Sequence, residues 1–338
     1  MSTTPGAPTP GNEAAPAGPS IFARLYGEQS FRDRFDADPR ESVDVIIPVM
    51  HTNELWRANL TSIYREIPVR RLIISDGGVR DDSLSIARSF PRITVLDHRE
   101  FVSLGYCLRK LIETVETDWF VYLHSDVFLA PGWFDAMVAD RHRFDWFESQ
   151  QHTTILAEVP LEHSVAERSY SGAQMGRRRA FDPVIPKIDD DFLYRNEDII
   201  LAHLVRKAGF KYGRADGALA YHQQMAKESL WRRDIAQVSI TIRKSAEEDL
   251  REKRTQLYGL LKYLDPDQET FNRYCLIDYI YDLLISGQMD WSEFAAWVKR
   301  TNPGWLPIIR RSRARNRVKR IFRGAGAALL RFVERFGF

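Results

Sequence analysis

Three adjacent residues, His124, Ser125 and Asp126, follow an apolar run at Trp119–Leu123. Residues i and i+2 of an extended chain point the same way, so this spacing predicts that His124 and Asp126 face a common point. A carboxylate suits Mg²⁺ or Mn²⁺, and an imidazole suits Mn²⁺ better than Mg²⁺. The pattern therefore indicates a divalent-cation site. For this motif taken alone, polar residues that merely end a strand are the commoner alternative.

A second group of chemically capable residues is Asn196-Glu197-Asp198, which precedes an apolar helical repeat. One interpretation is structural, because Asn is a good N-cap and acids in a first turn complement the helix dipole. The other is catalytic, because a carboxylate at a helix end can take the proton of an acceptor hydroxyl, and the dipole would keep Asp198 ionised. His222, after a short apolar run, is a third candidate, either a ligand or a structural histidine.

Four short apolar runs must position these residues. They are rich in β-branched and aromatic residues, which is typical of strands buried on both faces of a parallel sheet. The segments between them have helical spacing, and this alternation predicts an α/β doubly wound core. The runs are Val43–Val49, Arg71–Ser75, Ile93–Leu96 and Trp119–Leu123.

Polar residues follow each apolar run at once. Ligands of open parallel sheets bind beyond the carboxyl ends of the strands, so these side chains should gather along one edge. For any single group, turn formation or helix capping is the favoured explanation, but all four groups together favour a site. The groups are His51, Asn53 and Glu54; Asp76; Asp97 and His98; and His124, Ser125 and Asp126.

The second half of the chain continues with strands and then with helices. Strands are expected at Thr153–Val159 and Ala218–Tyr221, with a helix from Glu197 to Lys207 between them. Further helical patterns cover Ser229–Tyr258, Leu276–Ile285 and Trp291–Lys299. The predicted division is a disordered extension over 1–39, an α/β domain over 40–226, a helical subdomain over 227–309 and a basic tail over 310–338.

The amino-acid composition excludes several classes of protein function. The chain has 338 residues with 48 Lys and Arg against 46 Asp and Glu, a net charge of +2 that argues against a nucleic-acid binder. Two cysteines, Cys107 and Cys275, lie among apolar residues and are expected to be buried free thiols. The first 20 residues do not resemble a signal peptide, and no run of about 18 apolar residues occurs. A cytoplasmic location is therefore expected.

The C-terminal tail, residues 310–338, concentrates positive charge, with ten Lys and Arg against one acid, Glu334. Its apolar residues follow helical spacing, so a basic amphipathic helix is expected. Such a helix binds an anionic membrane surface, here the inner face of the cell membrane. The alternative is that the helix docks on the mildly acidic body of the same chain.

Five sequence blocks occur in order between Val43 and Gln223. They are VDVIIPV…NLTSI, LIISDGGVRDDSLSIA, WFVYLHSDVFLAPGWF, SGAQMGRRRAF and NEDIILAHLVRKAGFKYGRADGALAYH. In this order they resemble a family 2 glycosyltransferase of the GT-A fold. The resemblance implies a Rossmann-like, mostly parallel sheet flanked by helices, followed by a helical C-terminal subdomain.

The resemblance also implies a role for each matching residue. Asp126, the last position of the DxD motif, would bind a divalent cation, Mn²⁺ or Mg²⁺, with His222 as a further ligand. Asp198 would be the catalytic base, with Glu197 beside it to position the acceptor. His124 stands where the family has Asp, which bears on the choice of metal. The implied donor-binding residues are Pro48, Glu54, Asp76, His124, Ser125 and Gly172.

The implied function is an inverting, metal-dependent transfer of a hexosyl or deoxyhexosyl group. The donor would be a nucleotide sugar, and the acceptor a hydroxyl of a glycan or of a lipid-linked glycan. No residue pattern suggests a nucleophile for a double displacement, so inversion is expected. One alternative is a catalytically silent GT-A module that binds a glycan or a membrane, supported only by the missing first Asp of DxD. A sugar-nucleotidyltransferase would need a glycine-rich, arginine-bearing loop after the first strand, and none is present.

Overall fold

The computed structural model describes residues 31–37, 39–50, 52, 55–79, 81–99, 104–156, 171–188, 197–225, 254, 257–266, 280, 283–284 and 286–311. Its centre is one eight-stranded sheet in the order β3-β2-β1-β4-β7-β6-β8-β5. The strands are β1 Val43–Val49, β2 Val69–Asp76, β3 Ile93–Asp97, β4 Trp119–Leu123, β5 Val127–Leu129, β6 Trp146–Leu156, β7 Ala173–Arg177 and β8 Tyr212–Met225.

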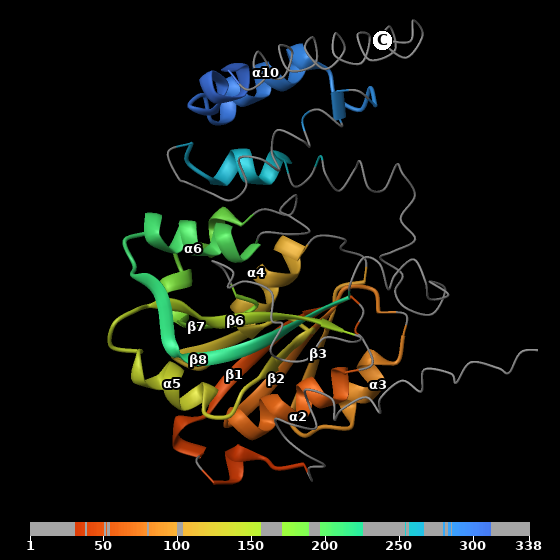
Figure 1. Cartoon of the computed structure of the whole chain (residues 1–338), viewed down its shortest axis with the longest axis vertical. Coiled ribbons are helices and arrows are strands. Elements are labelled where there is room, and N and C mark those ends of the chain that lie inside the picture. The colour runs from red at the N-terminus through yellow and green to blue at the C-terminus, as the bar shows by residue number, and fades with distance from the viewer. Residues whose placement is uncertain are drawn as a thin grey trace, which may run out of the picture.

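Helices cover both faces of the sheet (Figure 1). The helices α2, α3 and α5 lie on one side, and α4 and α6 lie on the other, with α10 further out on that second side. The α-helices are α2 Trp56–Glu66, α3 Ser83–Arg88, α4 Leu104–Thr114, α5 Trp133–Ala139, α6 Glu197–Lys207 and α10 Trp291–Thr301. Short 3₁₀ helices are η1 Arg34–Asp36, η2 Pro39–Glu41, η4 Arg178–Phe181 and η5 Ile185–Lys187.

Two apolar cores, one on each face, explain why the sheet forms. Successive strand residues point to opposite faces, so Ile46 of β1 enters the core beneath α4 and α6, while Val45 and Ile47 enter the core beneath α2 and α5. The strands β3, β2, β1 and β4 are all parallel, as their apolar runs predict. The expected α/β fold, a sheet flanked by helices and followed by a helical C-terminal part, is confirmed for the described residues.

The second half of the sheet is more mixed than expected. β7 pairs antiparallel with both β4 and β6, and β5 pairs antiparallel with β8. The predicted strand at Thr153–Val159 starts seven residues too late, since β6 begins at Trp146, and β8 is longer than Ala218–Tyr221. The reason is polar burial: Glu148, Ser149 and Gln151 lie inside the protein, so this strand carries no apolar run.

The connection between β4 and β5 is only three residues long, 124–126, although β7, β6 and β8 separate these strands in the sheet. Four strand spacings in a flat sheet amount to about 19 Å. Four Cα steps span at most about 15 Å. The sheet must therefore curl so that β5 returns to the end of β4. The backbone N–H of Leu129 in β5 donates to Ser62 Oγ of α2 at 3.1 Å, which fixes this edge.

The N-terminal segment is ordered from residue 31, which corrects the expected disordered extension over 1–39 for its last residues. Asp33 forms an ion pair with Arg92 at 2.6 Å, and the ring of Phe31 packs on those of Tyr64 and Phe90. These contacts attach the segment to the sheet domain. Residues 1–30 lie outside the described part.

The described C-terminal helices share the core of the sheet domain. Leu260, Val298 and Trp305 belong to the same buried cluster as Ile200 of α6. Asp290 caps α10 by accepting from the backbone N–H groups of residues 292 and 293. Among the described residues, no helix is both long and apolar enough to cross a membrane. Cys107 is a buried free thiol as expected, whereas Cys275 lies outside the described residues.

Candidate active site

The turn between β4 and β5 consists of His124, Ser125 and Asp126. The backbone N–H of His124 donates to the carbonyl of Gly172 at 2.8 Å, just before β7. The side-chain amide of Asn59 in α2 donates to the carbonyl of Ser125 at 3.0 Å. The turn is therefore held on one side by β7 and on the other by α2. It is a turn, and not the extended strand from which its convergence was predicted.

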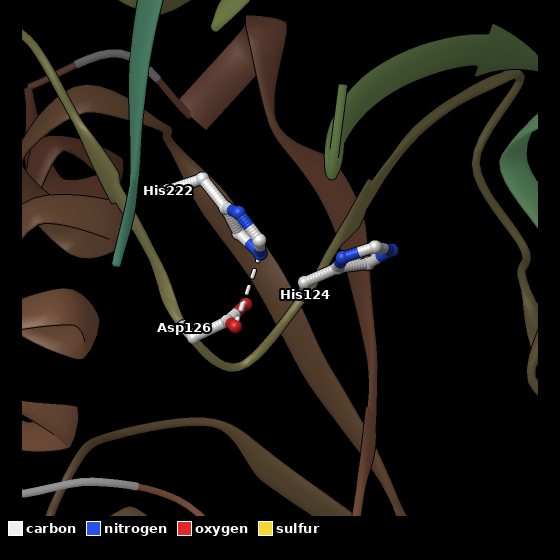
Figure 2. A group of neighbouring side chains, drawn as sticks. All are labelled: His124, Asp126 and His222. Atoms are coloured by element: carbon white, nitrogen blue, oxygen red, sulfur yellow. Dashed lines mark ion pairs between the residues drawn. The ribbon is translucent and has the colours of Figure 1, made fainter. Parts of the chain in front are cut away.

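His124, Asp126 and His222 converge at this turn (Figure 2). His222 lies directly opposite Val127 in the β5–β8 ladder, which brings its Nε2 to 3.0 Å from Asp126 Oδ2. One possible ligand atom from each of the three residues lies within 4.8 Å of the others. Two imidazole nitrogens and a carboxylate oxygen at this spacing fit a divalent cation, and they suit Mn²⁺ better than Mg²⁺.

The charges around the turn favour a cation. Burial of Asp126 opposes ionisation, but the charge and hydrogen bond of His222 outweigh it and lower the pKa of the Asp126 carboxyl below its usual value. Burial alone would lower the pKa of His124, yet the hydrogen bond and charge of Glu197 raise it to about 9. The carboxylates therefore stabilise positive charge at this point of the molecule.

The first residue of α6 reaches the turn. Glu197 Oε1 lies 2.7 Å from His124 Nε2, and the hydroxyl of Tyr122 donates to the same oxygen at 3.0 Å. Burial opposes ionisation of Glu197, but the bond and charge of His124 lower the pKa of its carboxyl. The helix start and the β4–β5 turn are thus joined by one direct contact between residues 73 positions apart.

Asp198, the next residue, is only partly buried. Its partial burial and the adjacent negative charge of Glu197 raise the pKa of its carboxyl to about 7, so the helix dipole does not keep it fully ionised at neutral pH as expected. A carboxyl with a pKa near neutrality is well matched to accepting a proton at physiological pH. The site therefore contains a cation-binding group and a candidate general base. Asn196, the expected N-cap, lies outside the described residues.

Gly172 makes room for His124. A Cβ at position 172 would lie 2.6 Å from His124 Nδ1 and 2.7 Å from its Cγ, closer than such contacts allow. The backbone of Gly172 instead lies against the imidazole ring. This gives Gly172, expected among the donor-binding residues, a direct steric role in seating His124.

The other expected donor-binding residues lie at the ends of β1 and β2. Asp76 is buried, and its oxygens accept from the backbone N–H groups of Gly78 and Val79 and from Arg99 Nε at 2.9 Å. Pro48 pairs in register with Ser75. Asp76 thus shapes the turn after β2, and a donor contact for it stays a prediction. Glu54, His51 and Asn53 lie outside the described residues.

Two residues of the site, Tyr122 and Asn59, were not predicted from the sequence. Tyr122 precedes His124 by two positions in the same strand, and that spacing was a usable signal for a shared face. Asn59 of α2 is fully buried and bonds to the turn, but its helical spacing suggested only packing. An Asn among the mostly apolar buried residues of this helix was the available signal, since buried amides need partners.

Residues 44–145 match the family model described as Glycosyl transferase family 2. The matched segment starts in β1, ends just before β6 and contains Asp76 and Asp126. The match covers less than a third of the chain, and it confirms the resemblance and the enzyme class expected from the sequence, a glycosyltransferase. Gly172, Glu197 and Asp198 lie beyond the matched segment. A comparison with curated proteins finds no match.

Two solved glycosyltransferase structures are reported as similar. S. aureus TarS 1-349 in complex with UDP has 15% sequence identity and a TM-score of 0.44, over 80% of this chain and 86% of that chain. The mannosyltransferase PcManGT from Pyrobaculum calidifontis, in complex with GDP-Man and Mn²⁺, has 13% identity and a TM-score of 0.43, over 88% and 92% of the two chains. Because both TM-scores are below 0.5, no ligand is assigned to this chain from them.

Proposed function

We propose that the chain is an inverting, cation-dependent glycosyltransferase that moves a sugar from a nucleotide-sugar donor to an acceptor hydroxyl. The observation that carries this proposal is the contact between the β4–β5 turn and the start of α6. His124, Asp126 and His222 gather there, and Glu197 and Asp198 follow on the other side of His124. A cation-binding group and a candidate base are thus adjacent, and Asp126 lies within the segment that matches the family 2 model.

The residues divide the chemistry between them. Asp126 and His222 would hold the cation, with His124 beside them. When bound, a divalent cation stabilises the negative charge that grows on the leaving diphosphate. Asp198 would take the proton of the incoming hydroxyl at its carboxylate. A single attack of this kind inverts the anomeric centre, and among the described residues at the site we assign no second nucleophile.

A panel of nucleotide sugars tests the function. Each donor is incubated with the chain in Mn²⁺, in Mg²⁺ or in chelator, and nucleotide release is measured with and without sugar acceptors. Cation-dependent release and a product of inverted configuration by NMR are expected. A retained configuration would contradict the single displacement. Absence of turnover with every donor would favour the silent GT-A module, for which His124 in place of Asp is the supporting feature.

We further propose that the acceptor is a glycan, free or carried on a lipid, and that the chain works at the inner face of the cell membrane. The sequence of residues 310–338 supports this, because its basic amphipathic pattern suits an anionic lipid surface. Most of that tail lies outside the described residues, so this part of the proposal depends on the sequence alone. No nucleic-acid partner is expected.

A further inference from the structure

The imidazole of His124 faces two different groups. Its Nε2 lies 2.7 Å from Glu197 Oε1. Figure 2 shows the other ring nitrogen on the side of Asp126 and His222. The ring cannot easily turn away from this position, because Gly172 lies against it and leaves space only for a hydrogen in place of a side chain. His124 is therefore placed to connect Glu197 with the candidate cation site.

Glu197 is directed into the protein and not toward an open acceptor site. Its side chain is only 5% exposed. Its Oε1 accepts from Tyr122, which is itself buried, and contacts His124. A carboxylate so enclosed is poorly placed to contact an acceptor molecule. It is well placed to orient the histidine.

We propose that Glu197 is the outer carboxylate of a cation site whose inner ligands are His124, Asp126 and His222. This inference rests on the cation dependence in the proposed function and changes the role expected for Glu197, from positioning the acceptor to positioning His124. A histidine that binds a metal usually donates its second ring N–H to a carboxylate, which fixes the tautomer and the ring orientation. Two imidazoles and one carboxylate favour a first-row transition-metal dication such as Mn²⁺ over Mg²⁺.

The arrangement has a consequence for the helix that carries the candidate base. Glu197 is the first residue of α6, and Asp198 is the second. A cation held by His124 would thus be linked through Glu197 to the backbone that positions Asp198. Loss of the link should weaken cation binding and, through the helix start, disturb the base.

Binding of Mn²⁺ to the full chain, in the absence of any donor, tests the inference. The signal of free Mn²⁺ is followed by electron paramagnetic resonance during titration. Outer carboxylates contribute roughly 10- to 100-fold to metal affinity, so Glu197→Ala should weaken binding by that factor. Glu197→Gln should weaken it less, because the amide oxygen can still accept from His124. Asp198→Asn is the matched control, since it removes a neighbouring charge without touching His124.

The outcomes separate this inference from the proposed function. Unchanged Mn²⁺ affinity in Glu197→Ala, or equal weakening in Glu197→Gln and Asp198→Asn, would overturn the outer-carboxylate role while cation dependence stood. Wild-type protein that binds no Mn²⁺ and still transfers sugar in chelator would overturn both the outer-carboxylate role and the cation dependence. If Glu197→Ala does not fold, the near-isosteric Glu197→Gln decides. With Co²⁺ as the probe, the visible spectrum of the Co²⁺-bound Glu197→Gln variant should differ from that of the Co²⁺-bound wild type. Asp198→Asn should leave the spectrum unchanged.

Discussion

The carboxyl of Asp198 has a pKa of about 7, because burial and the charge of Glu197 disfavour its ionised form. A general base must be ionised, so the transfer rate should rise about tenfold per pH unit below pH 7 and level off above it. Asp198→Asn cannot accept a proton. The transfer rate of this variant should fall by roughly 10²-fold or more, and the rise of the rate with pH should disappear.

The measurement is the rate of transfer from pre-bound donor between pH 5.5 and 8.5. Donor affinity, measured separately, should change little in Asp198→Asn. Asp216→Asn is the control, because it makes the same chemical change at an exposed position of β8. A wild-type profile that is flat with pH, or a loss of donor binding with normal transfer, would show that Asp198 has another role.

Asp126 provides the carboxylate of the candidate cation site, at 3.0 Å from His222 Nε2. Asp126→Ala should abolish cation-dependent turnover and weaken donor binding, because the diphosphate loses its counter-ion. Steady-state kinetics and calorimetric titration of a nucleoside diphosphate with Mn²⁺ check both expectations. Full activity of Asp126→Ala in the presence of chelator would exclude a cation role for this residue.

At the scale of the elements, the β4–β5 turn packs against Gly172, just before β7. This packing depends on the absence of a side chain at position 172. Gly172→Ala would place a methyl group 2.6 Å from His124 Nδ1, so the ring must move. Overpacking of this kind costs about 1–3 kcal/mol of the free energy of unfolding. Denaturant unfolding should show that loss, and Mn²⁺ affinity should fall with it.

Gly217→Ala is the matched control, because its Cβ would meet only Ala136 Cβ at an ordinary 3.5 Å. Its stability should change by much less than that of Gly172→Ala. Equal effects of the two substitutions would mean that the seating of His124 does not depend on Gly172.

The first four strands were predictable because each is an apolar run with a polar residue after it, although β3, at the edge of the sheet, is only partly buried. The strands after β5 were harder to predict. Glu148 accepts from Tyr212, Arg214 and the backbone of Ser171, so burial here depends on partners more than 20 positions away. The contact of His124 with Glu197 was unpredictable for the same reason, since it exists only once α6 has docked on the sheet. Residue types predicted the chemistry, and packing determined which oxygen faces which nitrogen.

On the scale of the whole molecule, the described helical residues within 257–264 and 291–311 extend the core on the α6 face, and the chain then continues into the basic tail. We expect this tail to bind anionic membranes, with binding that weakens as salt rises, since each Arg contributes about 1 kcal/mol near such a surface. Co-sedimentation with anionic and neutral vesicles tests this, for the intact chain and for a chain ending at Ile309. Equal pelleting of both chains, or no preference for anionic lipid, would contradict the anchor.

The three-residue connection between β4 and β5 has a consequence for how the protein can vary in length. Surface connections usually accept insertions, because their ends need not keep a fixed separation. This one joins the centre of a curled sheet to its edge, with almost no slack. One added residue between Ser125 and Asp126 would let β5 slip by one position against β8, and a slip of one reverses which side chains face the core. We expect a glycine inserted there to lower the unfolding temperature of the protein and to abolish Mn²⁺ binding, whereas a glycine inserted between the exposed residues His142 and Arg143 is tolerated.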